Sequence, residues 1–170
     1  MIEYRKIERS EKQELSNLVT LVLDKLERKE FFIPFDDEEL EAMFDENNAI
    51  TYGAYHGDKL VGTAQLYFGD EFVEKIKEAL ELKGCFVAEF GGVLVLPEYR
   101  NNGIMKEFSR ILMEEAKTKK YEYIVSVAHP ENMASNKGIL AMGAKLMKTG
   151  YLGEYYRNMY LLSLNTTAKN

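Results

Sequence analysis

The sequence predicts an α/β fold in which a mixed central sheet of about six to seven strands is flanked by helices. Segments of strand length, alternating or continuously apolar, are interleaved along the 170 residues with longer segments whose apolar residues recur at helical spacing. A chain of this length forms a single domain by default and buries a substantial core. We therefore expect one domain over residues 1–164, followed by a polar tail over residues 165–170.

The strands are indicated by alternation, by apolar runs and by the turn residues that bound them. Gly57 and Asp58 form a hairpin signal between two such segments. A long central strand stops at Pro97, and glycines inside that strand indicate a bulge or a close approach of the backbone. The expected strands span residues 2–7, 49–56, 59–68, 86–96, 123–128, 144–149 and 155–164.

The helices are indicated by apolar stripes and by residues that favour helix ends. Ser10 is a suitable N-cap for the first helix, and Asp36 or Asp37 for a short acidic one. Asp70 is a suitable cap for a third segment that Gly84 ends. The expected helices span residues 11–26, 36–44, 70–83, 104–119 and 132–142.

Composition and charge argue against several classes of protein. A formal net charge of −6 disfavours a nucleic-acid partner held by phosphate contacts. No apolar stretch reaches the ~20 residues that cross a bilayer, and no signal-peptide core is present. Cys85 is the only cysteine, so it forms no intramolecular disulfide, and we expect a buried, inert thiol. We expect a cytoplasmic protein without a membrane partner.

The most informative segment runs from Gly91 to Met105, where an apolar strand is followed by a glycine turn and a helix. A helix start offers unpaired N–H groups and a favourable dipole to a phosphate or pyrophosphate. Gly103 lets the backbone approach such an anion, and Arg100 adds a positive charge. The P-loop pattern is absent, and the turn holds one glycine where the dinucleotide fingerprint needs three.

The turn resembles the acetyl-CoA loop of the GNAT superfamily of N-acetyltransferases, whose signature is Arg or Gln, two variable residues, Gly, one variable residue and Gly or Ala. Met105 stands where the family has the final small residue. The element order is similar to the family's over nearly the whole chain, apart from the inserted segment from Asp70 to Lys83. The matching residues are Arg100, Asn101, Asn102, Gly103 and Ile104.

The resemblance implies acetyl-CoA as donor and direct attack on it by a primary amine within a ternary complex. The acceptor is a small-molecule amine or a peptide that the sequence does not identify, and the expected assembly is a monomer or homodimer. The family pattern also implies that the segment from Phe31 to Phe44 lines the acceptor pocket. The insertion either covers that pocket or only packs against the core.

Glu89 is the expected general base, because an ammonium must lose a proton before it attacks. The alternative is a solvated residue on the polar side of its strand. By the resemblance, Val93 and Val95 pair with the pantetheine arm through main-chain atoms. A backbone N–H freed near Leu94 is expected to stabilise the thioester oxygen as it gains negative charge.

Asn132 and Ser135 stand where the family often contacts the cofactor from the next helix, although Asn132 is also a standard N-cap. Ile139 stands where family members often have the tyrosine that protonates the departing thiolate. This leaves Ser135, a water or a C-terminal tyrosine as donor, or unassisted departure. The candidate tyrosines are Tyr151, Tyr155 and Tyr156.

His129 is expected near the site, as a capping residue rather than a catalytic one, and His56 at the surface. Two distant histidines and one cysteine form no ligand cluster, so we expect no metal and no nucleophilic triad. The alternative function is a degenerate acyl-CoA-binding or regulatory domain of the same fold. Met105 and Ile139 favour this alternative.

Overall fold

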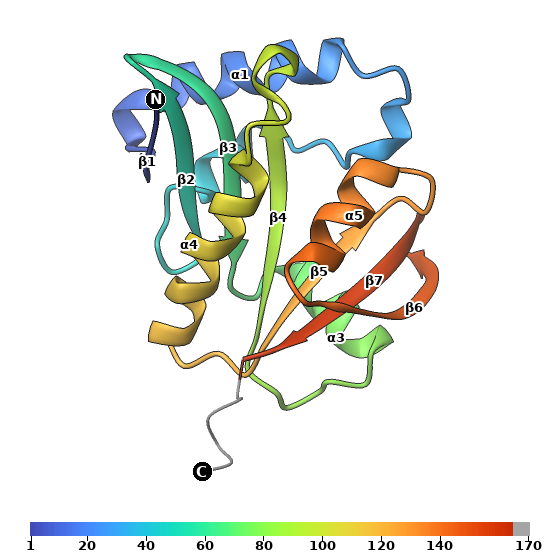
Figure 1. The fold of residues 1–170 in the computed structure, drawn as a ribbon. Helices are drawn as coiled ribbons and strands as arrows, with labels where there is room; N and C mark the ends of the chain where they lie inside the picture. The colour runs from blue at the N-terminus through green and yellow to red at the C-terminus, as the bar shows by residue number, and fades with distance from the viewer. Residues whose placement is uncertain (165–170) are drawn as a thin grey trace.

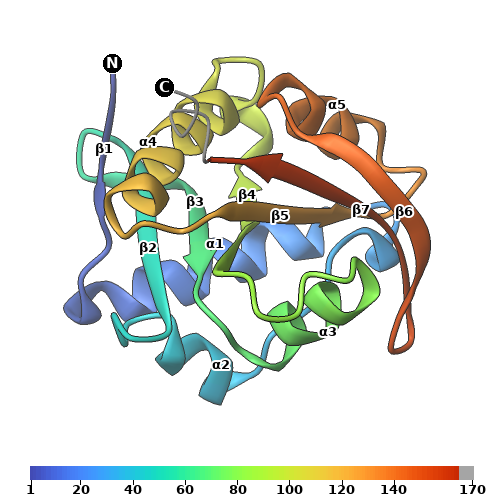
Figure 2. The same cartoon turned by 90° about the horizontal axis from the view of Figure 1, so that it is seen from below.

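A computed structural model describes residues 1–164, so the expected polar tail, residues 165–170, lies outside the described part. The chain forms one seven-stranded sheet with helices on both faces, which confirms the predicted fold class (Figures 1 and 2). The strands are β1 (Ile2–Lys6), β2 (Ala49–His56), β3 (Lys59–Tyr67), β4 (Val87–Val95), β5 (Tyr123–Ala128), β6 (Lys145–Leu152) and β7 (Tyr155–Ser163). The helices are α1 (Lys12–Asp24), α2 (Asp37–Ala42), α3 (Glu71–Ala79), α4 (Ile104–Thr118) and α5 (Met133–Ala141), with 3-10 turns η1 (Arg9–Glu11), η2 (Lys29–Phe31) and η3 (Pro97–Tyr99).

The strand order is β1-β2-β3-β4-β5-β7-β6, and every neighbouring pair is antiparallel except β4 and β5. That parallel pair is connected through α4, as parallel strands require a crossover. It is paired only from Val87 to Glu89, opposite Tyr123 to Val125. Figure 1 shows the two strands starting side by side and then diverging. A gap therefore lies in the middle of the sheet.

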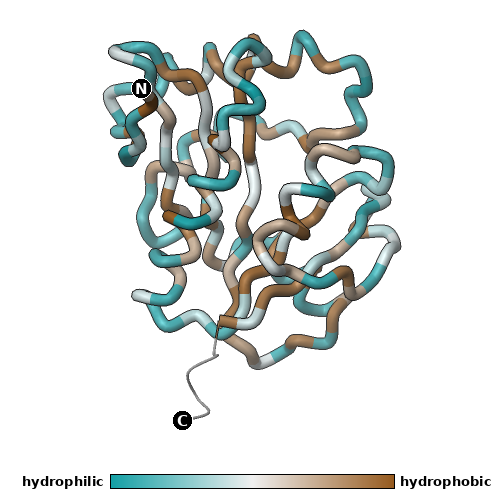
Figure 3. The backbone as a smooth tube through the Cα atoms, in the orientation of Figure 1, coloured by the Kyte–Doolittle hydropathy of each residue, from teal (hydrophilic) through white to brown (hydrophobic). Residues whose placement is uncertain are grey.

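Helices α1, α2 and α3 cover one face of the sheet, and α4 and α5 cover the other (Figure 2). Hydrophobic residues concentrate on the strands between these layers, whereas the connections are largely hydrophilic (Figure 3). Phe90 of β4 and Phe108 of α4 belong to the main core, and both are almost fully buried. Ile76 of α3 packs on a second cluster that includes Val87 and Met159. The inserted segment therefore packs against the core, on the face that α1 and α2 also cover.

Most helix ends lie within two residues of their expected positions, but two differ. Ser10 does not cap the first helix. It lies inside η1, and the Glu11 carboxylate accepts from the Glu8 N–H at 3.0 Å, so that α1 begins at Lys12.

Cys85 is partly exposed rather than buried, although it packs against the second cluster.

Helix α3 ends at Ala79, earlier than Gly84 suggested, because Glu81 adopts a left-handed backbone with φ of 58°. The Leu82 N–H donates to the Lys77 carbonyl at 2.8 Å, and the Glu81 N–H donates to the Glu78 carbonyl at 3.2 Å. These two bonds form a Schellman motif, in which glycine normally occupies the left-handed position. Sequence reasoning missed this end because Glu81 is a residue that rarely adopts this conformation.

Glu81→Gly is expected to stabilise the protein by about 0.5–1 kcal/mol, because glycine adopts a positive φ without a Cβ clash. Thermal unfolding should show a rise in Tm of about 1–4 °C for a chain of this size. Lys75→Gly, at an exposed position in the interior of the same helix, is the matched control and should lose about 1 kcal/mol. A loss of stability in both variants would contradict the strain at Glu81.

Candidate active site

β4 bends away from β5 at a bulge that contains Gly92. In the β3–β4 register, the step from Gln65 back to Thr63 spans two residues, whereas the matching step on β4 spans three. β4 therefore carries one extra residue, which increases its local bend and twist. Gly92 has a φ of 64°, and a Cβ there would lie 1.8 Å from Gln65 Oε1. Only glycine suits both this backbone conformation and this contact.

Ser126 marks the point at which β4 and β5 separate, because its hydroxyl donates to the Phe90 carbonyl in place of a strand partner. Within residues 1–164, no residue of β4 after Glu89 pairs with β5. Val93, Leu94 and Val95 lie beyond this point, so their strand borders the gap. The structure thus places the residues expected to hold the pantetheine arm on a part of β4 that does not pair with β5.

Glu89 is 6% exposed and lies on β4 at the last pair before the gap. No hydrogen bond or ion pair to its carboxyl group is found among the described residues. Every fully buried side-chain oxygen or nitrogen of that part of the chain has a partner, so the Glu89 oxygens keep contact with solvent. Burial, and then the charge of Asp70, raise the pKa of Glu89 to about 8. The group is therefore a proton acceptor that titrates close to neutral pH.

Asp70 has two roles: its side chain caps α3, and its negative charge acts on Glu89. Its side chain caps α3 by accepting from the Val73 N–H at 2.9 Å, as expected from the sequence. The same carboxylate disfavours ionisation of Glu89 and of Tyr67. The insertion therefore brings a negative charge toward the candidate base.

Tyr67 was not expected from the sequence, and it lies opposite Glu89 in the β3–β4 register. Its hydroxyl donates to Gln65 Oε1 at 3.1 Å, and Gln65 Nε2 donates to Thr63 Oγ1 at 2.9 Å. Thr63 in turn donates to the Tyr52 carbonyl. Burial and the charges of Glu89, Asp70 and Glu39 raise the pKa of Tyr67 well above its usual value, so its hydroxyl stays protonated. The sequence did carry a signal for this network, because Thr63, Gln65 and Tyr67 are polar residues at alternate positions of a strand that is otherwise apolar.

The turn before α4 has the conformation expected of an anion site. Asn101 and Gly103 have φ of 65° and 74°, and the Asn102 amide holds the turn by donating to the Tyr99 and Arg100 carbonyls. No side chain caps α4, and a Cβ on Gly103 would meet nothing within 4 Å. The N–H groups of the first helical turn, from Ile104 onward, thus face open space next to the exposed Arg100.

Met105 points away from this turn and toward α5. A Cβ on Gly138 would lie 2.5 Å from Met105 Sδ, so the missing side chain of Gly138 makes room for the methionine. The bulk of Met105 is therefore used in the α4–α5 contact. The sequence showed the departure at Met105 but not the glycine that accommodates it.

Asn132 caps α5, because its Oδ1 accepts from the Ser135 N–H at 3.2 Å. This confirms the structural interpretation of Asn132, and contact of either residue with a cofactor stays a prediction. Ile139 is 2% exposed and packs among Ala128, Ala144 and Tyr160. The position of the family's tyrosine is thus filled by a core residue.

Asn136, one turn after the cap, connects the loop after β5 to β7. Its Nδ2 donates to the His129 and Asn132 carbonyls at 2.9 and 2.7 Å. Its Oδ1 accepts from Asn158 Nδ2 and from the Tyr160 hydroxyl. This buried amide, which sequence reasoning missed, fixes the C-terminal border of the gap.

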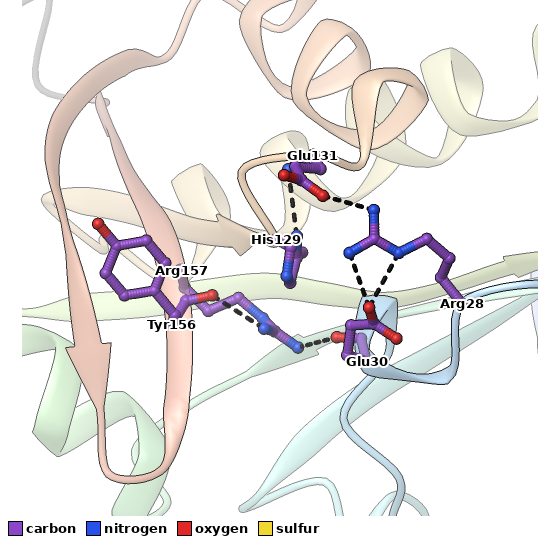
Figure 4. A network of polar contacts seen from close by, with 6 residues as sticks. All are labelled: Arg28, Glu30, His129, Glu131, Tyr156 and Arg157. Carbon is purple, nitrogen blue, oxygen red and sulfur yellow. Dashed lines mark hydrogen bonds and ion pairs between the residues drawn. The ribbon is translucent and has the colours of Figure 1, made fainter.

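The connection between α1 and α2 crosses to the other side of the gap (Figure 4). Arg28 forms ion pairs with Glu30 and with Glu131 of the loop after β5. The Phe31 and His129 rings lie 5.1 Å apart, and His129 Nδ1 accepts from the Glu131 N–H, which matches its expected capping role. The beginning of the expected acceptor segment, residues 31–44, is thus held beside the gap. His56 is exposed, as expected.

Within the described residues, no group of three or more His, Cys, Asp or Glu side chains is arranged to hold a metal ion. None of the helices there is long and apolar enough to span a bilayer.

The model of the acetyltransferase (GNAT) family matches residues 21–143, which include β4 with its bulge and the glycine turn before α4. The chain belongs to the GNAT family. It is therefore an acyltransferase. The family that the glycine turn and the element order predicted is thus confirmed. No curated protein matches the chain by sequence.

Solved GNAT structures share the fold at low sequence identity. An N-acetyltransferase from Staphylococcus aureus is 16% identical with a TM-score of 0.73, over 96% of this chain and 98% of that one. NAA60 of Arabidopsis thaliana in complex with acetyl-CoA is 13% identical with a TM-score of 0.75, over 97% and 99%. The yncA protein of Salmonella typhimurium with its cofactor acetyl-CoA is 14% identical with a TM-score of 0.71, over 97% and 95%.

Substitution of Gly92 tests whether the bulge that separates β4 from β5 requires glycine. Gly92→Ala is expected to lose about 2–4 kcal/mol of stability, because it combines a left-handed L-residue with overpacking against Gln65. Gly57→Ala is the matched control, since Gly57 has a φ of 63° but nothing within 4 Å of a Cβ. It should lose only the backbone contribution, about 1–2 kcal/mol. Equal losses in denaturant unfolding would show that Gln65 moves aside freely.

Proposed function

We propose that this chain is an acetyl-CoA-dependent N-acetyltransferase that moves an acetyl group to a primary amine of a small molecule or peptide by direct attack in a ternary complex. One observation carries the proposal: the carboxyl group of Glu89 is almost buried, unpartnered and in contact with solvent, at the point where β4 leaves β5. Structures of NAA60 with acetyl-CoA and with a bisubstrate analogue support the choice of donor and reaction.

The residues around the gap fit acetyl-CoA. The unpaired N–H groups at the start of α4, with Arg100 beside them, suit the pyrophosphate. The unpaired edge of β4 from Val93 to Val95 suits the pantetheine arm, and Asn132 and Ser135 are proposed as further contacts. When bound, acetyl-CoA supplies a thioester whose acetyl carbon is open to nucleophilic attack.

Glu89 acts as the general base in this proposal. The acceptor arrives as an ammonium, and its proton passes to Glu89, directly or through water. The amine nitrogen then forms a bond to the acetyl carbon as the carbon–sulfur bond breaks, and the nitrogen loses its second proton to water, which leaves the amide and the CoA thiolate. Because burial and Asp70 raise the pKa of Glu89 to about 8, the carboxyl becomes competent as pH rises through that value. Ile139 has no proton to offer the departing thiolate.

A degenerate acyl-CoA-binding domain is the second candidate, and the buried Ile139 is the observation that favours it. Met105 no longer does so, since Gly138 accommodates its side chain. Release of free CoA thiol from acetyl-CoA across a panel of amines distinguishes the two. Binding of acetyl-CoA without release from any amine would favour the binding domain.

Acetyl-CoA at 100 times its Kd should stabilise the chain by about 2.7 kcal/mol, which raises Tm by about 5–10 °C. Arg100→Gln should reduce this rise, because a charge beside the pyrophosphate is lost. Arg110→Gln, on an exposed arginine of α4 that pairs with Glu107, should keep it and is the control. An equal rise from pantetheine alone would contradict the placement of the pyrophosphate.

Glu89→Gln should lower kcat by about 10²- to 10⁴-fold while the affinity for acetyl-CoA stays nearly constant. The wild-type rate, measured with one amine throughout, should rise with pH up to about 8. Asp70→Asn keeps the helix cap but removes a charge, so it should shift this rise to lower pH. Wild-type turnover in Glu89→Gln would remove Glu89 from the mechanism.

A further inference from the structure

Arg157 of β7 is a buried arginine without an acidic partner. It is 3% exposed, and no carboxylate within residues 1–164 forms an ion pair with it. Among the described residues, its guanidinium donates to two backbone carbonyls, those of Tyr156 at 2.9 Å and Glu30 at 2.8 Å (Figure 4). Burial lowers the pKa of Arg157, as expected when a positive charge leaves water. The charge of this side chain is therefore not neutralised by direct contact.

The guanidinium also has donors to spare. An arginine offers five N–H donors, and the two carbonyls account for two of them. Nε has no acceptor, yet no fully buried nitrogen of the described side chains lacks a partner. Nε is therefore not completely shielded from solvent, and its N–H is a donor that no group of the described chain uses.

Arg28, the other arginine in Figure 4, is 41% exposed in its side chain and pairs with the carboxylates of Glu30 and Glu131. The Glu30 carboxylate faces Arg28, whereas its backbone carbonyl accepts from Arg157. The acidic groups of this region are thus engaged by the exposed arginine. The charge of the Glu30 carboxylate also reaches Arg157, but the two groups form no ion pair, so the remaining N–H donors of Arg157 are available to a ligand.

Strand register places Arg157 on the same sheet face as Glu89, across the gap. Met159 packs with Val87 and Ile76 of α3, and side chains alternate along a strand, so Arg157 and Glu89 both lie on that face. Glu89 of β4 pairs with Val125 of β5, which in turn pairs with Leu161 of β7. Arg157 lies four residues before Leu161 on β7. At about 3.3 Å per residue, the two side chains arise roughly 13 Å apart along the strand direction.

We propose that the amine acceptor also carries a carboxylate, which Arg157 binds while the amine meets Glu89. The acceptor class is then a small amino carboxylate rather than a polyamine. A single guanidinium with a free edge matches one carboxylate, often by paired hydrogen bonds. A dianionic phosphate would find no second cation there, because Arg28 is already paired. This inference rests on the proposed function and identifies its substrate class.

The test compares acetylation of glycine and β-alanine with that of their amides, and of aminomethylphosphonate. The ratio of kcat/KM for each carboxylate to that for its amide is measured first in the wild type. Arg157→Gln should lower this ratio by about 10- to 100-fold, and Arg157→Lys, which keeps the charge but not the planar fork, should lower it less. Ratios are compared between variants at one pH, so the differing amine pKa values of acid and amide cancel.

Glu131→Gln is the matched control, because it breaks the ion pair between Arg28 and the loop after β5 while Glu30 stays paired with Arg28, and it should preserve the ratio. Equal ratios in Glu131→Gln and Arg157→Gln would show that Arg157 only holds the loop, and would overturn the inference. So would a wild type that prefers the phosphonate. Tm measurements on each variant confirm that the compared proteins are folded.

A second measurement does not depend on turnover. N-acetylglycine should raise the Tm of the wild type more than N-acetylglycinamide does, and Arg157→Gln should remove the difference. Acetylation without a carboxylate preference would refute the inference and leave the proposed function standing. Carboxylate-dependent stabilisation without acetylation of any amine would refute the proposed function and support the anion site.

Discussion

The glycine bulge in β4 is the constraint on which the arrangement of this molecule depends. A strand in the middle of a sheet normally pairs on both sides, because unpaired backbone groups are costly to bury. Here the extra residue at Gly92 turns β4 away from β5, and Ser126 satisfies the Phe90 carbonyl where pairing stops. The gap so formed exposes a strand edge at the centre of the fold. Each candidate functional group lies along its border.

Next to the bulge, the side chains of β3 form a hydrogen-bonded network instead of apolar contacts. Tyr67, Gln65 and Thr63 hydrogen-bond in sequence and end on a backbone carbonyl. Such a chain is stable in an interior only when its members are satisfied, and they are. Gln65 has to occupy the place of a side chain at position 92, so the glycine and the network require one another.

Two buried ionisable residues, one on each side of the gap, lack a partner of opposite charge within the described chain. Glu89 and Arg157 are each at least nine-tenths buried, yet neither has an oppositely charged partner in the described chain. A buried charge without a partner lowers stability. Proteins keep such groups chiefly at functional sites, where a ligand completes them. Once Glu89 has lost its proton, a carboxylate at one side and a guanidinium at the other match an acceptor that carries both signs of charge.

The sequence by itself determined the order of the elements, the caps at Asp36 and Asp70, the glycine turn before α4 and the candidate base. These depend on local physics, namely hydrophobic period, capping hydrogen bonds and the conformational freedom of glycine, which neighbouring residues report. It did not reveal the partners of Met105, Tyr67 or Arg157. Those contacts join residues far apart in the chain, such as Gly138 with Met105 and Glu30 with Arg157, and a single sequence carries no local signal for them. Only the packing of α4 on α5, and of the α1–α2 connection across the gap, decided where these side chains lie.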